Sequence, residues 1–190
     1  MTASETTPTT EPRAQRADAR RNRERILAAA REAFAQAGRQ VQMPDVAHAA
    51  GVGVGTLYRH FPAKEDLVRA LVWDKVQAGI DTAREALERD DPLEAIEWLV
   101  HENAGKMAHS RGLRDAMSVI DFGDDNPWNG AEARQCAADV LGRAQAASAI
   151  RADVTVDDWQ ALMCGLAAAI ATGADPARQA EFVLSAVRSS

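Results

Sequence analysis

The chain has 190 residues, of which 46% are hydrophobic and 26% charged, with a net charge of −6. Such a chain is globular, with one domain or two small ones. Cys136 and Cys164 have no paired spacing, so we expect reduced thiols rather than a disulfide or metal framework. The sequence has no apolar run of about 18 residues that would span a membrane. It also lacks the apolar run of a signal peptide, so we expect a cytoplasmic protein with no membrane partner.

The charge is distributed unevenly along the chain. Residues 13–64 contain ten Arg and Lys against four acidic residues, a net charge of +6, whereas residues 65–190 carry −10. This asymmetry suggests a basic, DNA-facing head on an acidic body.

The N-terminal segment is rich in Thr, Ser, Pro and Glu, which is typical of disorder. We expect residues 1–18 to form a disordered basic arm. Arginines in and just after this segment are candidates for contacts with phosphates or the minor groove, the alternative being a solubilising tail. They are Arg13, Arg16, Arg20 and Arg21. A helix follows, with an apolar stripe from Ile26 to Ala37 that Gly38 brings to an end.

Two short helices separated by glycines are predicted next. Residues 43–50 have apolar positions at helical spacing, residues 51–53 turn the chain, and residues 54–60 form a second helix with Leu57 directed inward. Two short helices around a glycine-containing turn are the pattern of a DNA-binding helix-turn-helix, whose second helix enters the major groove.

The remaining chain is predicted to be helical, with no convincing strand. Asp91 is the expected N-cap of one helix, with Pro92 at its first position. Helices are expected at 64–89, 92–107, 110–120, 131–149, 156–172 and 175–188, with a loop at 121–130. The fold class is therefore all-α, with about nine helices.

Three stretches of the sequence resemble the tetracycline-repressor-like (TetR) family of bacterial one-component regulators. They are RERILAAAREAFAQAG (23–38), DVAHAAGVGVGTLYRHF (45–61) and PAKEDL (62–67). The resemblance implies a three-helix DNA-binding head, which we place at residues 19–65. It also implies a helical ligand-binding and dimerisation body, which we place at 66–190. The expected function is that of a homodimeric repressor, released from a palindromic duplex operator by a small molecule of unknown identity.

The resemblance also suggests which residues contact DNA. The candidates are Gly53, Val54, Gly55, Thr56, Tyr58, Arg59, His60 and Lys64. Gly55 lets the backbone approach the bases closely, and Thr56 can bond a base or a phosphate. Many relatives carry Lys in place of Val54. Because valine offers only apolar contact, we expect recognition of DNA shape to be more important here than direct base contacts.

Phosphate contacts are the expected role of the residues that follow in the motif. Tyr58, Arg59 and His60 resemble family positions that contact mostly phosphate, and Lys64 begins a helix whose free amides can also meet a phosphate. The alternatives are a core role for Tyr58 and a solvated side chain for His60.

The body contains only weak candidates for a ligand site. Asn103 lies on an apolar stripe and needs a partner, either a ligand or a neighbouring helix. Residues that could line a mostly apolar pocket are Trp98, His101, Asn103, Met107, Met117, Phe122, Trp128 and Met163. Taken singly, each of these residues is more often ordinary core or surface.

The last two helices are expected to pair with their copies in a second subunit as a four-helix bundle. Small residues that would allow close approach are Gly165, Ala168, Ala169, Ala171 and Thr172. The alternative is that they serve packing within one subunit.

Three other functions were weighed against a repressor. An enzyme is disfavoured because the chain has no nucleophile elbow, phosphate loop, paired Cys ligands or His-Glu-x-x-His, so we expect no catalysis, cofactor or metal. An architectural DNA protein is disfavoured by the acidic body. An activator, or a repressor without a small-molecule ligand, stays open at this point.

Overall fold

The computed structural model describes residues 11–110, 112–114 and 130–189. Within these ranges the chain has the predicted all-α architecture, and one isolated bridge joins Ile150 to Arg188. The helices are α1 (Glu11–Ala37), the short 3-10 helix η1 (Gly38–Gln40), α2 (Met43–Ala49), α3 (Val54–His60), α4 (Lys64–Leu87), α5 (Pro92–Ala108), α7 (Ala131–Ala146), α8 (Val156–Ala171) and α9 (Pro176–Val187). A helical turn at 112–114 follows α5.

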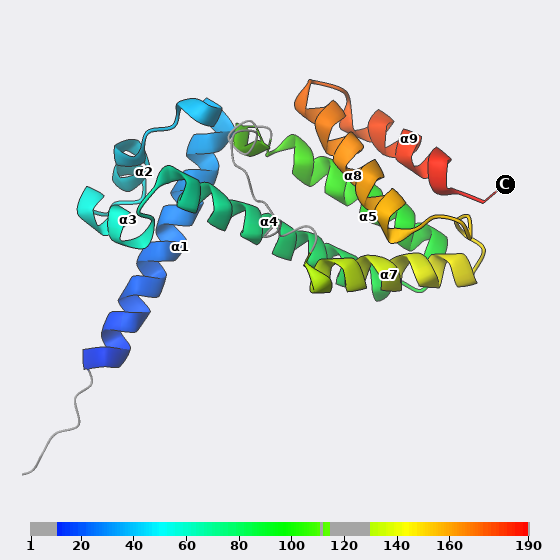
Figure 1. Ribbon diagram of the computed structural model, residues 1–190, viewed down its shortest axis with the longest axis horizontal. Coiled ribbons are helices and arrows are strands. Elements are labelled where there is room, and N and C mark those ends of the chain that lie inside the picture. The colour runs from blue at the N-terminus through cyan, green and yellow to red at the C-terminus, as the bar shows by residue number, and fades with distance from the viewer. Residues whose placement is uncertain (1–10, 111, 115–129, 190) are drawn as a thin grey trace, which may run out of the picture.

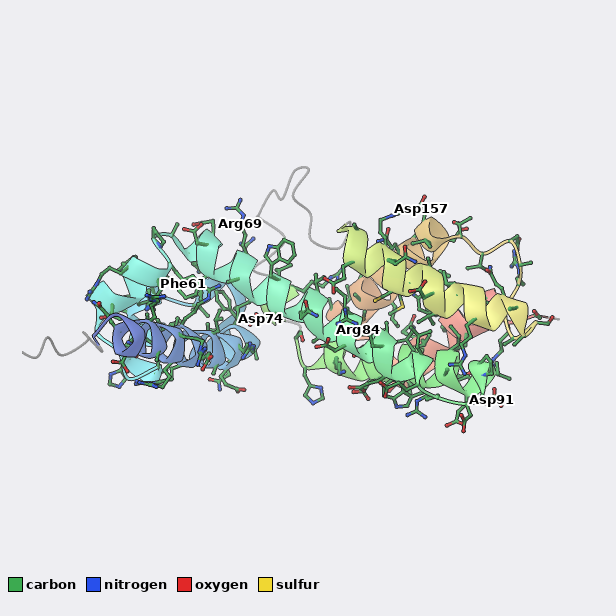
Figure 2. All side chains as sticks on the ribbon, turned by 90° about the horizontal axis from the view of Figure 1, so that it is seen from below. Phe61, Arg69, Asp74, Arg84, Asp91 and Asp157 are labelled. Carbon is green, nitrogen blue, oxygen red and sulfur yellow. The ribbon has the colours of Figure 1, made fainter. Side chains whose placement is uncertain are left out.

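The long helix α4 joins a small head to a larger body (Figure 1). In the head, α1 packs on α2 and α4, and the apolar stripe of α1 forms the centre of the core. Leu57 of α3 is buried in the same core. Phe61, which follows α3, is also buried there and lies among the helices of the head (Figure 2). The first turns of α4 complete the core through Leu67, Val68, Leu71 and Val72. The head core thus extends into α4, beyond the boundary expected at residue 65.

Helix α1 begins earlier than predicted. Residues 11–18, expected to be part of a disordered arm, are helical, while residues 1–10 lie outside the described residues. Alanines and short-range ion pairs favour this helix without any packing. Arg20 pairs with Glu24 at 3.7 Å, and Arg21 pairs with Asp18. As predicted, the helix ends at Gly38, which has a φ of +50°.

The body is a bundle in which α5 packs on α4, α7, α8 and α9. Its core combines Ile96, Leu99 and Val100 of α5 with Val140 and Leu141 of α7, Trp159, Leu166 and Ile170 of α8, and Val183, Leu184 and Val187 of α9. The predicted start of α5 is confirmed, because the Asp91 carboxylate accepts a hydrogen bond from the amide of Leu93 at 2.8 Å. Arg143 of α7 provides a hydrogen-bond donor for the free carbonyls at the C-terminal end of α4, donating to the Leu87 carbonyl at 2.7 Å.

Helix α7 ends at Ala146 rather than at the predicted residue 149. Ser148 has a φ of +56°, a left-handed conformation that stops the helix. The chain then crosses to α9, where Ile150 pairs with Arg188. Of the helix predicted over 110–120, the turn at 112–114 is described. Residues 121–129 of the predicted loop lie outside the described residues.

Candidate DNA-binding site

An arginine from α1 holds the turn between α2 and α3. Gly51 has a φ of +62°, which favours glycine, and an added Cβ would lie 2.7 Å from Nη2 of Arg25. The same Nη2 donates to the carbonyl oxygens of Ala50 and Gly51, each at 2.6 Å. Sequence reasoning counted Arg25 among the basic residues and missed this role. Arg25 lies in a run of basic residues just before Ile26, and this local pattern gives no indication of a partner in the turn.

Helix α3 is anchored from one side and uncovered on the other. Leu57 is fully buried, whereas Val54, Gly55, Tyr58 and Arg59 are exposed. Tyr58 is 44% exposed, so it is not a core aromatic. A Cβ added at Gly55 would meet no atom within 4 Å, which leaves the backbone accessible from outside. We call the exposed residues Gly53, Val54, Gly55, Tyr58 and Arg59, with the half-buried Thr56, the α3 face.

Polar groups gather at one end of the α3 face. Arg59 donates through Nε to the Gly55 carbonyl and through Nη2 to Oγ1 of Thr56, both at 3.2 Å. The Thr56 hydroxyl keeps its own proton for an outside acceptor. His60 is half-buried with its ring tilted on Phe61, so it is less accessible than Arg59. Because α3 contains no acidic residue, the face is suited to a negatively charged partner.

Lys64 is tied to the protein itself. Its Nζ donates to the carbonyls of Arg39 at 2.6 Å and Val41 at 2.7 Å, which closes the connection between α1 and α2. An ammonium has three donors, so one N–H remains for a phosphate. Sequence reasoning did not indicate this structural role, since both partners are backbone groups more than twenty residues away.

The body touches the head core through the turn at 112–114. Leu113 is buried among the head residues, and an added Cβ at Gly112 would lie 1.8 Å from the Phe34 carbonyl oxygen. Arg114 donates to the Cys164 carbonyl of α8 at 3.5 Å, and burial, with a smaller effect of Arg114, lowers the pKa of Lys75 on α4 to about 8. Sequence reasoning placed this turn in a body helix and missed its contact with the head.

An open groove with a volume of about 640 Å³ lies between helices α8 and α9. Its walls are mostly apolar or small, and include Ala161, Leu162, Gly165, Leu166, Phe182, Val183 and Ala186. Of the small residues predicted for close approach, Gly165, Ala168, Ala171 and Thr172 are exposed and Ala169 is half-buried. Phe182 is 55% exposed, unusual for a large apolar side chain.

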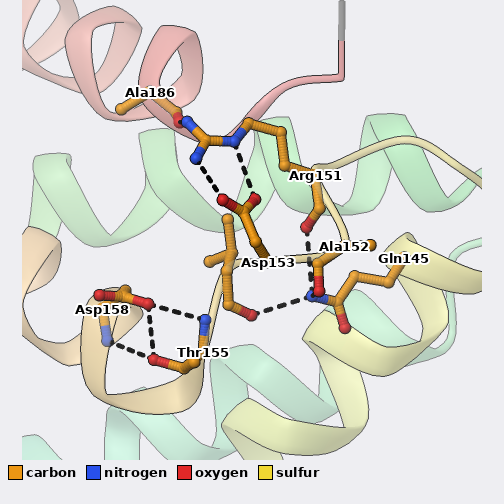
Figure 3. A network of polar contacts seen from close by, with 8 residues as sticks. Gln145, Arg151, Ala152, Asp153, Thr155, Asp158 and Ala186 are labelled. Atoms are coloured by element: carbon orange, nitrogen blue, oxygen red, sulfur yellow. Dashed lines mark hydrogen bonds and ion pairs between the residues drawn. The ribbon is translucent and has the colours of Figure 1, made fainter.

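A polar network fixes one end of this groove (Figure 3). Arg151 binds Asp153 through hydrogen bonds of 2.9 and 2.6 Å, which lowers the pKa of that carboxyl, and donates to the Ala186 carbonyl at 3.2 Å. Thr155 and Asp158 cap α8 reciprocally, with the Asp158 amide 3.1 Å from Oγ1 of Thr155. The connection from α7 to α8 is thereby tied to α9.

The residues predicted to bind a ligand do not share a cavity among the described residues. Trp98 lies under the Arg89 guanidinium at 4.2 Å, and the amide of Asn103 donates to the Leu99 carbonyl at 2.9 Å. Met107 and Met163 pack against the body core. Nε2 of His101 lies 3.0 Å from Oε1 of Glu181 on α9. Met117, Phe122 and Trp128 lie outside the described residues. None of the five described candidates lines the α8–α9 groove, and their binding role stays a prediction.

Among the residues described, no helix combines the length and apolar character that crossing a bilayer requires. The same residues contain no group of three His, Cys, Asp or Glu side chains placed to hold a metal ion.

The helical fold and the uncovered α3 face define a DNA-binding protein of the helix-turn-helix class. The family described as bacterial regulatory proteins, tetR family, matches residues 26–71, and the C-terminal domain of SbtR-like transcriptional regulators matches residues 91–189. The crystal structure of a TetR transcription regulatory protein from Mycobacterium vanbaalenii is 34% identical, with a TM-score of 0.69 over 92% of this chain and 99% of that chain. The chain belongs to the TetR family of transcriptional regulators, which are DNA-binding proteins.

Curated relatives match over a shorter span. The HTH-type transcriptional regulator UidR of Escherichia coli K12 is 34% identical over 96 residues, 48% of this chain and 49% of that protein. The HTH-type transcriptional repressor KstR of Mycolicibacterium smegmatis is 37% identical over 101 residues, 52% of this chain and 50% of that protein. This chain therefore spans about half the length of these relatives.

Proposed function

We propose that this protein is a homodimeric repressor that a small-molecule ligand releases from its operator. The observation that carries the proposal is the uncovered α3 face on a head that shares α4 and Leu113 with the body. The name of KstR, a transcriptional repressor, supports the sign of regulation. DNA binding, dimerisation and ligand release involve different residues, so each can be tested separately.

The α3 face is proposed to enter the major groove. At about 1.5 Å per residue the seven-residue helix is roughly 10 Å long, so mainly its first turn reaches the bases. Gly53 to Thr56 would lie there, and Tyr58, Arg59, His60 and Lys64 would bind phosphates. If a dimer neutralises about eight phosphates, the logarithm of affinity falls with the logarithm of salt concentration with a slope near −7.

The groove between α8 and α9 is proposed to pair with its copy in a second subunit. Small exposed residues on α8 permit close approach, and Phe182 supplies an apolar anchor beside them. A stable interface needs about 800 Å² from each partner, which two adjacent helices provide more readily than one. Two heads would then contact the two halves of a palindromic operator.

Ligand release is proposed to act through α4. This helix contributes Leu71 and Val72 to the head core and Ala83 and Ala86 to the body core, so a ligand that repositions it also repositions the head. Linkage requires that DNA weaken ligand binding by the factor by which the ligand weakens DNA binding, typically 5–150-fold. Equal ligand affinity with and without operator would refute this part.

DNA binding is tested by selecting duplexes from a random library with the purified chain. The selected duplex is then titrated with Arg59→Gln, and with Arg31→Gln as a control at the opposite end of the head. Arg31 pairs with Asp74 of α4, away from the α3 face. We expect only Arg59→Gln to reduce the salt slope, by about 0.9. Equal binding of unrelated duplex would favour an architectural protein instead.

Dimerisation is tested by a matched pair of substitutions. Phe182 and Trp73 are 55% and 56% exposed, and only Phe182 lines the α8–α9 groove. Phe182→Arg should give a monomer in sedimentation analysis, while Trp73→Arg on α4 should leave the dimer intact. If both variants sediment as the wild type does, the proposed interface is wrong.

A further inference from the structure

The N-terminal half of α1 projects past the DNA-binding site. Figure 1 shows α1 continuing well beyond α2 and α3. The first buried side chain of α1 among those described is Ile26, and Arg25 is the residue that holds the turn before α3. The preceding residues 11–25, which we call the α1 extension, reach about 21 Å past that turn at about 1.5 Å per residue.

The α1 extension is basic and has no apolar face. Residues 15–25 contain five arginines and two acidic residues, a net charge of +3. Arg20 and Arg21 keep 75% and 63% of their side chains exposed, although each has an acidic neighbour on the same helix. Surface pairs of this kind are weak and screened by salt, so a phosphate can replace the carboxylate. A helix that is polar all round is typical of a solvated bridge to another polar structure.

The root of the α1 extension is continuous with the DNA-binding site. Arg25 bonds the turn that precedes α3, and the Arg23 guanidinium lies 4.8 Å over the ring of Phe61, the residue that follows α3. The α1 extension therefore starts beside α3 and continues beyond it (Figure 1), within reach of a duplex that α3 enters. Duplex DNA carries one negative charge per about 1.7 Å of axis, opposite in sign to the net charge of the extension.

We propose that the α1 extension binds the phosphate backbone of the DNA flanking each operator half-site. The proposal rests on the function proposed above and adds to it a contact outside the recognition helix. A length of about 21 Å corresponds to roughly six base pairs at 3.4 Å each. Each protomer of a dimer contributes one extension, so both flanks of the operator are bound.

The test measures the affinity of each protein variant for duplexes of two lengths. Wild type, Arg20→Gln/Arg21→Gln and the control Arg84→Gln/Arg134→Gln are titrated over a range of salt. The DNA is a duplex selected from a random library, either trimmed at the half-sites or extended on both flanks. Both double variants remove two positive charges, but Arg84 and Arg134 lie on the body, paired with Glu132 and Asp157. Glutamine is a good helix former, and the exchanged side chains in the extension are largely exposed, so the melting midpoint should not change.

We expect wild type and the control to bind the extended duplex more tightly than the trimmed one. Arg20→Gln/Arg21→Gln should lose this preference, with a salt slope on the extended duplex less steep by about 1.8. With a slope change of this size, the ratio of wild-type to variant affinity rises about 12-fold when the salt concentration is lowered fourfold. Hydroxyl-radical footprints should shrink on both flanks in this variant alone.

Several outcomes would overturn the inference. An unchanged slope and flank preference in Arg20→Gln/Arg21→Gln would show that the extension does not contact DNA. An equal loss on both duplexes would point to a general charge effect, as would the same loss in the control. A salt-dependent compaction of the free protein, lost in this variant, would place the extension on the acidic body instead. If wild type selects no duplex at all, the function proposed above fails as well.

Discussion

The substitution Gly112→Ala tests whether the turn at 112–114 couples the body to the head. An added Cβ would lie 1.8 Å from the Phe34 carbonyl oxygen and 3.2 Å from the Cα of Ala35. Real Cβ atoms essentially never approach another atom within 3.0 Å, so the turn must move away from α1 by at least the missing 1.2 Å. Because α1 backbone is the obstacle, no side-chain rotation can relieve the contact.

The cost of this movement follows from the neighbour of Gly112. Leu113 is buried in the head core, where a fully buried leucine stabilises by about 1.5–3 kcal/mol. Overpacking of this kind costs about 1–3 kcal/mol, against a helix-propensity gain of about 0.5–1 kcal/mol for Gly to Ala. The net expectation is a loss of about 1–2 kcal/mol. For a chain of this length it corresponds to a melting midpoint lower by roughly 2–8 °C.

Thermal melting of Gly112→Ala is compared with that of Gly105→Ala and Gly142→Ala. Those glycines lie within α5 and α7, and a Cβ at either would meet nothing within 4 Å. The same chemical change there should stabilise by about 0.5–1 kcal/mol. The sign of the effect thus separates the contact from propensity. A Gly112→Ala protein as stable as the two controls, with wild-type affinity for selected duplex, would refute the reasoning.

Three further substitutions have expected outcomes. Arg25→Met removes both hydrogen bonds to the turn at Gly51, so melting should show a loss of about 1–2 kcal/mol, and DNA affinity should fall with it. A melting midpoint equal to that of the wild type would contradict the structural role of Arg25. Burial, with a smaller effect of Arg114, lowers the pKa of Lys75 from 10.5 to about 8, so the folded state binds fewer protons than the unfolded state between these values and stability rises with pH there. Lys75→Met should abolish that rise and increase the free energy of unfolding at pH 7 by about 1–3 kcal/mol. If melts of the variant over a pH series show the same pH dependence of stability as the wild type, this expectation is wrong. Asp91→Ala removes the cap of α5 and should cost about 1 kcal/mol in chemical denaturation, whereas an unchanged midpoint would mean that water replaces the cap.

Local chemistry made much of this fold predictable. Asp91 with Pro92, and Asp175 with Pro176, begin helices where the sequence indicated, because caps depend only on neighbouring residues. The bounds of α3 were also predicted, from the glycine-containing turn that precedes it rather than from a side-chain cap. The extent of α1 was not, because low hydrophobicity in residues 11–18 predicted disorder while alanines and ion pairs support a helix there.

Long-range contacts account for what the sequence could not indicate. Lys64 was predicted as a phosphate ligand and Arg25 was counted only as one of the basic residues, yet both donate to backbone carbonyls more than twenty residues away. Any residue supplies a carbonyl, so no side-chain pattern marks such a partner. Leu113 was equally hidden, since an apolar residue in a body helix gives no indication that it packs in the head.

The arrangement of the two cores explains why α4 is the element through which the domains can influence each other. Its buried residues from Leu67 to Val72 belong to the head core, while Ala83 and Ala86 belong to the body core. A helix transmits rotation rigidly over this distance, whereas a flexible linker would not. Leu113 adds a second attachment of the body to the same head core. On the mechanism proposed above, a movement of either attachment would shift the α3 face relative to the body. We therefore expect substitutions in the body core to change DNA affinity even at residues that touch no DNA.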